Sequence, residues 1–166
     1  MKTLRLTRHA KSSWKAPELD DRDRGLNKRG ERDLPRMAAA LATRVEPCVI
    51  HASPARRARL TLEGLCAHWP ELDSLPHTLE EDLYTFSTAE LLEWLAEQPA
   101  SADAIWIVGH NPALTGLVNY LAGDDPLDNL PTCGFVELRA DVDRWDQLMQ
   151  GSAEITFRLF PKHLRD

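Results

Sequence analysis

The sequence has little of what marks several common classes of protein. Its 166 residues include three cysteines at irregular spacing, which is not the pattern of a disulfide framework. It lacks a glycine-rich nucleotide loop and a Walker sequence. No apolar run approaches the length of a membrane-spanning helix, and the N-terminus has no apolar signal-peptide core. We therefore expect a cytoplasmic protein that does not associate with membranes.

A surplus of positive charge is also absent. The 20 lysines and arginines are outnumbered by 26 aspartates and glutamates, which gives a net charge of −6 at pH 7. This balance argues against a general affinity for nucleic acids, although a locally basic pocket can still bind a small anion. The histidines at positions 51, 68, 77 and 163 show no zinc-ligand spacing, and we expect neither a metal nor a cofactor.

What is present is an ordinary globular composition, 43% hydrophobic and 28% charged, from which we expect one domain over residues 1–166, acting as a monomer. Runs typical of strands occupy residues 4–7, 47–52, 77–79, 104–108, 133–138 and 154–160. Segments with helical spacing follow each of the first four runs. This order predicts an α/β fold, a three-layer α/β/α sandwich with a mostly parallel central sheet and late antiparallel strands.

The first strand-like run ends at Arg8 and His9. Because the carboxyl ends of parallel strands form the ligand-binding edge of an α/β sheet, both side chains are expected at that edge. A neutral imidazole is a good nucleophile toward phosphorus, and a neighbouring guanidinium can hold phosphoryl oxygens while disfavouring protonation of the imidazole. The alternative is a strand-end histidine beside an exposed arginine, which other parts of the chain must exclude.

Two further strands end in groups of the same kind. Ser53 and Pro54 follow the second strand, and Arg56, Arg57 and Arg59 crowd the first turn of the next helix. Helix dipoles disfavour cations at that end, so a bound anion is one explanation for them, and exposure to solvent is the other. The run 104–108 ends in a second histidine, His110. Cations and imidazoles surrounding one phosphoryl group would stabilise its transfer without a metal.

These segments resemble a known family. Thr7-Arg8-His9-Ala10 resembles the Arg-His-Gly/Ala signature of the histidine phosphatase (phosphoglycerate mutase-like) superfamily. Residues 53–61 resemble its Ser-Pro-x-x-Arg-Ala-x-x-Thr motif, and residues 108–112 its second-histidine motif. The match spans nearly the whole chain, with three motifs in the right order. Residues 8–14 and 26–30 are closer to the short SixA-like phosphohistidine phosphatases than to the mutases.

The resemblance implies roles for single residues. It makes His9 the nucleophile that becomes phosphorylated, Arg8 and Arg57 the clamps on the phosphate, and His110 the second pocket histidine. The family spacing selects Arg57, whereas the residues alone leave Arg56 and Arg57 equal.

Four more residues lie in or beside these motifs. We expect Ser13, Arg24 and Asn111 to contribute to substrate binding, and Trp14 to line the rim of the pocket.

The general acid is the least determined group. Larger members of the family carry an acidic residue after the third strand, where this chain has Glu81 and Asp82. We select Asp82, with a solvated acidic turn and no acid at all as the alternatives. Imidazole, the leaving group of phosphohistidine, needs an acid less than an alkoxide does, so a missing acid points toward that substrate.

These observations together predict a metal-independent phosphatase that forms a phosphohistidine intermediate on His9. The expected partner is a phosphoprotein carrying phosphohistidine, and the alternatives are a small phosphorylated substrate or a non-catalytic phosphate-binding module. Cys133 and Arg139 have the Cys-x5-Arg spacing of cysteine-dependent phosphatases. The residues between them have the pattern of a strand rather than an anion-binding loop, so we interpret that match as chance.

Overall fold

The computed structural model describes residues 1–164, which form a six-stranded sheet in the order β3-β2-β4-β1-β5-β6. The strands β1 to β4 are parallel, β5 is antiparallel to β1, and β6 is antiparallel to β5. The α/β architecture and the late antiparallel strands are therefore confirmed. The strand bounds are β1 Lys2–Arg8, β2 Ile50–Ala52, β3 Thr78–Leu79, β4 Ala104–Gly109, β5 Phe135–Ala140 and β6 Ala153–Leu159.

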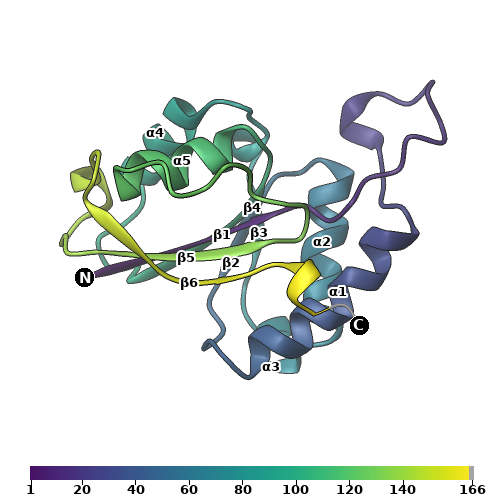
Figure 1. Cartoon of the computed structure of the whole chain (residues 1–166), viewed down its shortest axis with the longest axis horizontal. Coiled ribbons are helices and arrows are strands. Elements are labelled where there is room, and N and C mark those ends of the chain that lie inside the picture. Colours follow the sequence, from purple (N-terminus) through teal and green to yellow (C-terminus); the bar gives the residue numbers. More distant parts are fainter. Residues whose placement is uncertain (165–166) are drawn as a thin grey trace.

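Helices cover both faces of this sheet (Figure 1). One face carries α1, α2 and α3, and the other carries α4 and α5. The helices are α1 Lys28–Ala42, α2 Arg56–Ala67, α3 Pro70–Asp73, α4 Thr88–Ala96 and α5 Ala113–Ala122. Four short 3-10 turns are η1 Asp21–Asp23, η2 Glu81–Leu83, η3 Trp145–Gln147 and η4 Pro161–His163.

Strand β4 shows why the central run is apolar at every position. Ile105 and Ile107 belong to the core under α4 and α5, whereas Trp106 and Val108 belong to the core under α1 and α2. Successive side chains of a strand point to opposite faces, and both faces are covered here. The strand is thus buried on both faces, which fixes the position of its carboxyl end at the edge of the sheet.

Most predicted boundaries hold to within a few residues. Asn27 caps α1 by accepting a hydrogen bond from the backbone of Gly30, and Ser87 caps α4 in the same way. Strand β5 begins two residues after the predicted start, because Cys133 has a left-handed backbone with φ of 61° and cannot continue a strand. The short helix α3 was not predicted.

The connections create a crevice between β1 and β4. The chain leaves β1 through α1 on one face of the sheet, and it leaves β4 through α5 on the other face. Neighbouring parallel strands whose helices diverge in this way form the ligand-binding crevice of open α/β sheets. The residues after these two strands are His9 and His110, the two histidines singled out in the sequence.

The segment between β1 and α1 folds back on itself before α1 begins. The amide of Asn27 donates to the carbonyl of Lys11, and the amide of Ser13 donates to the carbonyl of Gly25. A Cβ atom at Gly30 would collide with the backbone of Lys11, so only glycine allows helix α1 to approach this closely. Residues 14–24 therefore form a loop that is closed at its base.

Across residues 1–164, no helix combines the length and the apolar character required to span a membrane.

Candidate active site

The register of the sheet brings the two histidines together. Arg8 is paired with Gly109, so the residue after each strand lies at the same level. The amide of His9 donates to the carbonyl of Gly109 at 3.1 Å, and the imidazole rings of His9 and His110 lie 5.3 Å apart between centroids. Ser53 joins them from β2, where its amide donates to the carbonyl of Val108. The predicted convergence of three strand ends is present.

A cavity of about 220 Å³ opens above these strand ends. It is lined by Arg8, His9, Lys11, Ser12, Trp14, Asp21, Arg57, Phe86, His110, Asn111 and Thr132. Three of these side chains are cationic and one is anionic. The cavity therefore has the size and the charge of a site for a phosphoryl group.

His9 is held as a neutral imidazole with one available nitrogen. Its Nδ1 lies 2.8 Å from the carbonyl oxygen of Ala10, which can accept a hydrogen bond only from a nitrogen that carries a proton. The other nitrogen, Nε2, is then unprotonated. Burial, together with the positive charges of Arg57 and Arg8, lowers the pKa of His9 to about 4. A free lone pair is thus present throughout the neutral pH range.

His110 is also neutral but has the opposite tautomer. Its Nδ1 lies 3.4 Å from a guanidinium nitrogen of Arg57, which can only donate, and its Nε2 lies 2.8 Å from the hydroxyl of Ser53. The proton therefore resides on Nε2. Burial and the neighbouring His9 and Arg57 lower the pKa of His110 to about 3. An anion bound in the cavity would raise the pKa values of His9 and His110 again.

Two arginines supply the positive charge. Arg8 donates to the carbonyl of Leu130, and its buried Nε has no hydrogen-bond partner. Burial and the positive charge of the nearby Arg57 both lower the pKa of Arg8. An oxyanion between them would accept hydrogen bonds from both and cancel their repulsion.

Arg57 is held in position by a residue that the sequence did not single out. Its guanidinium donates to the backbone carbonyl of Asp21 at 2.6 Å and to the Asp21 carboxylate at 2.9 Å. The hydroxyl of Tyr84 donates to the same carboxylate. Burial opposes ionisation of Asp21, yet the hydrogen bonds from Tyr84 and Arg57 keep the pKa of its carboxyl below the ordinary value.

The comparisons with known proteins agree with this geometry. Residues 4–88, about half of the chain, match the family model described as histidine phosphatase superfamily (branch 1). The chain belongs to the histidine phosphatase superfamily. A relative from Arabidopsis thaliana, named only as an uncharacterized chloroplastic protein, is 30% identical over 152 residues, which are 87% of this chain and 69% of that protein.

Solved structures place this histidine phosphatase near the SixA proteins. A candidate phosphohistidine phosphatase SixA from Agrobacterium tumefaciens superposes with a TM-score of 0.80 at 26% identity, over 96% of this chain and 98% of that one. A protein histidine phosphatase SixA complexed with tungstate shares the fold, with a TM-score of 0.72, 20% identity and coverage of 98% and 99%. The phosphoglycerate mutase-like fold expected from the sequence is thereby confirmed.

The three arginines of the first turn of α2 separate in this histidine phosphatase. Arg57 is buried in the cavity, as the family motif implied. Arg56 is exposed and packs over Gly25, and Arg59 pairs with Glu63 along the helix. Only the arginine whose side chain turns toward the sheet reaches the phosphate site. The local sequence could not distinguish Arg56 from Arg57. The folded structure does, because it shows which face of α2 packs against the sheet.

Of the three residues expected to bind substrate, the structure places only Asn111 in the cavity. Its amide donates to the carbonyl of Leu130 at 2.9 Å, which fixes the turn after β4. Ser13 lines a neighbouring hollow instead, beside Arg56. Arg24 turns back into its own loop, where its guanidinium donates to the carbonyls of Ala16 and Leu19 and lies 4.0 Å from the ring centre of Trp14.

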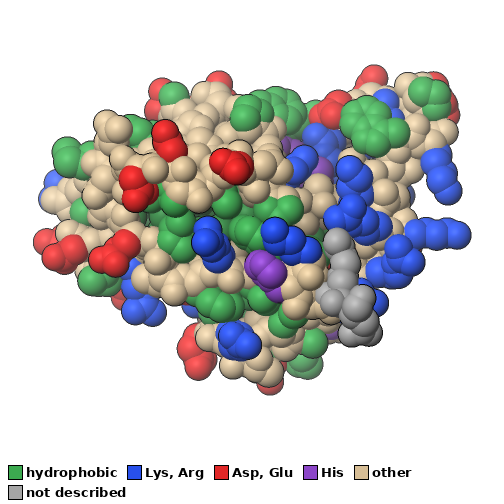
Figure 2. Space-filling model, viewed as in Figure 1, with side chains coloured by type: hydrophobic (Ala, Val, Ile, Leu, Met, Phe, Trp, Pro, Cys, Tyr) green, Lys and Arg blue, Asp and Glu red, His purple; other side chains and the backbone are tan. Residues whose placement is uncertain are grey.

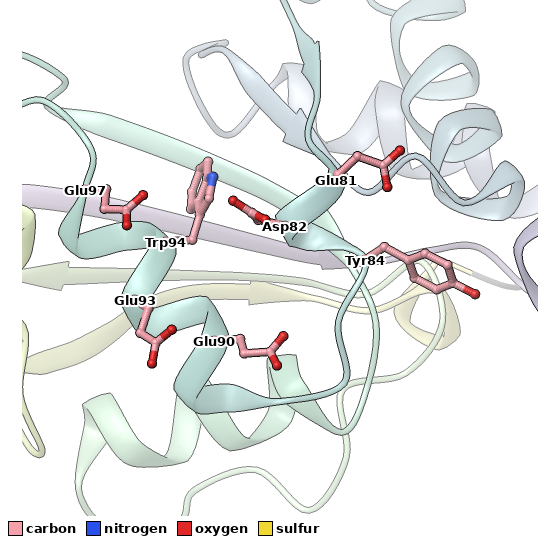
Figure 3. Close-up of a pocket in the computed structure, with 7 residues that line it drawn as sticks. All are labelled: Glu81, Asp82, Tyr84, Glu90, Glu93, Trp94 and Glu97. Atoms are coloured by element: carbon pink, nitrogen blue, oxygen red, sulfur yellow. The ribbon is translucent and has the colours of Figure 1, made fainter.

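Asp82, chosen as the general acid, is not brought to the cavity. It lies in a separate acidic groove of about 330 Å³ (Figure 3), lined by Glu81, Asp82, Tyr84, Glu90, Glu93, Trp94 and Glu97. The turn η2 buries Leu83 in the core, which directs Asp82 toward Trp94. The hydroxyl of Tyr84 instead reaches Asp21, and its ring centre lies 5.4 Å from that of His110. This corrects the expected position of the acid. Asp21, in the loop after β1, is the carboxylate among the residues that line the cavity.

Cys133 does not form an anion-binding loop with Arg139. Its amide donates to the carbonyls of Arg8 and His9, and its side chain is buried in the core. Arg139 is paired with Thr3 at the far end of the sheet. The Cys-x5-Arg spacing has no chemical meaning in this fold. Among residues 1–164, no cluster of three or more histidine, cysteine or acidic side chains could hold a metal ion.

Proposed function

We propose that this histidine phosphatase acts on phosphohistidine carried by a phosphoprotein, through a phosphohistidine intermediate on its own His9. The observation that carries the proposal is the fixed tautomer of His9. Because Nδ1 donates to the carbonyl of Ala10, the lone pair of Nε2 is available in the cavity that also holds Arg8 and Arg57. A nucleophile of this kind needs no base to activate it.

The reaction would proceed in two displacements. In the first, the Nε2 lone pair of His9 forms a bond to phosphorus while the bond from phosphorus to the leaving nitrogen breaks, and that nitrogen retains the bonding electron pair. In the second, the oxygen of a water molecule forms a bond to the phosphorus of phosphorylated His9 while the bond from phosphorus to Nε2 breaks. Nε2 recovers its electron pair, the proton of the water passes to solvent, and orthophosphate is released. Arg8 and Arg57 would hold the equatorial oxygens throughout both steps, because negative charge is spread over them.

The surroundings of the cavity favour an imidazole leaving group. Asp21 is the carboxyl group among the lining residues, and its bonds to Arg57 and Tyr84 keep it ionised, so it has no proton to donate. An alkoxide departs poorly without an acid. The imidazole of phosphohistidine departs as a neutral ring once its distal nitrogen has been protonated from solvent. The available groups therefore suit a phosphoramidate better than an ester.

Rapid-quench mass spectrometry with a phosphohistidine peptide tests the proposal. We expect a transient phosphoryl adduct on His9 and loss of turnover in His9→Ala. The matched control is His68→Ala, which removes an exposed histidine outside the cavity and should turn over like the wild type. Phosphate binding without turnover in the wild type would identify a binding module instead. A preference for phosphoserine or a sugar phosphate would identify an esterase.

Three further expectations stay predictions: a cytoplasmic location, a monomeric state and a single domain over residues 1–166. A phosphoprotein partner belongs with them. It is supported by the cavity's small size and by its position at the surface, where a protein-borne phosphoryl group can enter. Size-exclusion chromatography with light scattering measures the oligomeric state directly.

A further inference from the structure

Two large aromatic side chains stand exposed at the cavity that holds the histidines. Trp14 is 64% exposed and Phe86 is 50% exposed, and both line the cavity. They come from different segments, the loop after β1 and the turn before α4. Exposed aromatic surface is costly in water, and contiguous apolar area beside a polar site marks a ligand-binding surface.

Phe86 is held rigidly in its exposed position. Its neighbours on both sides are fixed by the first turn of α4: the hydroxyl of Thr85 donates to Glu90, and the hydroxyl of Ser87 accepts from the Glu90 amide. The ring of Phe86 lies 5.5 Å from that of His110. The backbone is thus held on each side of Phe86, and its ring, which also lies 6.0 Å from that of Tyr84, is placed beside the histidines.

Trp14 is held by a different device. The buried guanidinium of Arg24 lies 4.0 Å from the ring centre, and it is fixed in turn by the carbonyls of Ala16 and Leu19. A guanidinium stacked on an indole restrains the ring without covering its other face. The ring is therefore ordered and partly open where it lines the cavity. This gives Arg24 a positioning role in place of the direct substrate contact expected from the sequence.

The cavity thus combines a cationic floor with an aromatic rim. The floor, with Arg8 and Arg57, suits a phosphoryl group, and the rim suits a flat ring attached to it. The carboxylate of Asp21 lies at the same cavity and distinguishes between two kinds of ring. It would repel the negative charge that develops on a departing phenol, whereas it would attract the protonated imidazole ring of phosphohistidine.

We propose that Trp14 and Phe86 form a leaving-group subsite that stacks against the imidazole ring of a phosphohistidine substrate. This inference rests on the proposed function and adds the residues that select the leaving group. The substrate ring would enter with its distal nitrogen protonated and thus cationic, which strengthens its contact with both aromatic faces. When the phosphorus–nitrogen bond breaks, its electron pair stays on the ring nitrogen, and neutral imidazole departs.

The test compares leaving groups with and without a ring. The kcat/KM of wild type, Phe86→Ala and Trp14→Ala is measured on phosphoimidazole, on phosphotyrosine and on phosphoramidate, whose leaving group is ammonia. We expect each variant to lose about tenfold on phosphoimidazole and to stay within about twofold of wild type on phosphoramidate, since stacking on an aromatic side chain is typically worth a factor of this order. Phe86→Tyr should restore the rate.

A matched control is Leu79→Ala, which removes an exposed apolar side chain outside the cavity and should leave all three rates unchanged. Equal losses on phosphoimidazole and phosphoramidate would overturn the subsite, because the rings would then only support the fold. A larger loss on phosphotyrosine than on phosphoimidazole would overturn the choice of imidazole. Failure of the wild type to hydrolyse any of the three would overturn the proposed function itself, a result distinct from the other two.

Discussion

Two hollows of the molecule are lined by side chains of opposite charge. The phosphate cavity is lined by two arginines, a lysine and two histidines, whereas the groove shown in Figure 3 is lined by four glutamates and Asp82. In the space-filling view, basic side chains gather on the right of the visible face, whereas acidic ones are spread over its left, top and bottom (Figure 2). The molecule thus concentrates basic side chains locally despite its overall negative balance.

The two hollows differ in how the chain builds them. The groove takes most of its carboxylates from one helix, where residues 90, 93 and 97 share a face because they are spaced three and four apart. The cavity takes its groups from the ends of three strands, which only the register of the sheet brings together. Local periodicity is enough to make a solvated charged face, but a reactive site needs tertiary structure to hold like charges close to each other.

Removing a cation from the cavity should have the largest effect on kcat/KM and tests the difference between the two hollows most directly. Arg57→Ala should lower kcat/KM by about 10²- to 10³-fold, the usual effect of losing one preorganised donor to a developing charge. Arg56→Ala, on the same helical turn but outside the cavity, and Glu93→Gln, in the groove, should leave it within twofold. Steady-state kinetics on phosphoramidate measures all three. Equal losses in Arg56→Ala and Arg57→Ala would refute the placement.

The buried imidazoles predict a pH dependence of stability. The pKa values of His9 and His110 are about 4 and about 3, below the ordinary value of 6.5. Between pH 6.5 and these lower pKa values, the unfolded chain therefore binds more protons than the folded one. The free energy of unfolding is then highest above pH 6.5 and falls as the pH drops toward 4. The loss between pH 7 and pH 5 should be on the order of 2 kcal/mol for each imidazole.

Urea unfolding followed by tryptophan fluorescence at the two pH values measures this loss. Phosphate should reduce it, because an anion in the cavity stabilises the protonated rings. His68→Ala serves as the control, since an exposed histidine should not change the pH dependence. If the wild type is equally stable at pH 7 and pH 5, the two rings are not buried in the neutral form.

A smaller effect distinguishes the carboxylate of the cavity from that of the groove. Asp21→Asn keeps the shape of the side chain but weakens its hold on Arg57, so kcat/KM should fall about tenfold, in the range expected for a hydrogen bond to a charged group. Asp82→Asn should stay within twofold. A loss above a hundredfold in Asp82→Asn, together with disappearance of the alkaline limb of the pH–rate profile, would restore Asp82 as the acid.

The smallest effect concerns the ion pair that links the turn of Asp21 to the turn of Asp82. Arg22, next to Asp21, donates two hydrogen bonds to Glu81, next to Asp82. The pair is largely exposed, so Glu81→Gln should leave both the free energy of unfolding and kcat/KM close to their wild-type values. A change of several-fold in kcat/KM would show that this pair sets the position of Asp21.

Much of the fold and half of the site could be predicted from the sequence. Strand-like apolar runs and helical spacing are local signals, and they identified the strands, four of the helices and the strand ends that carry His9 and His110. Arg57 needed the family motif, because the orientation of neighbouring residues on a helix depends on which face packs on the sheet.

The remainder depends on tertiary contacts that leave no local trace. Asp21 and Asp82 both stand in short acidic turns of similar composition, and only the burial of Leu83 decides that Tyr84 rather than Asp82 reaches Asp21 and His110. Arg24 could not be assigned either, because its partners are carbonyls of its own loop. Trp14 was expected at the rim and lies there.

The closed base of residues 14–24 has a consequence for how substrate preference can change. The contacts of Ser13 with Gly25 and of Asn27 with Lys11 fix the start and the end of this excursion independently of what lies between them. A loop of different sequence can therefore be grafted there while the nucleophile keeps its place on the sheet, as long as the graft retains a carboxylate at the position of Asp21 to hold Arg57. The face of the subsite that Trp14 supplies thus becomes exchangeable without moving His9.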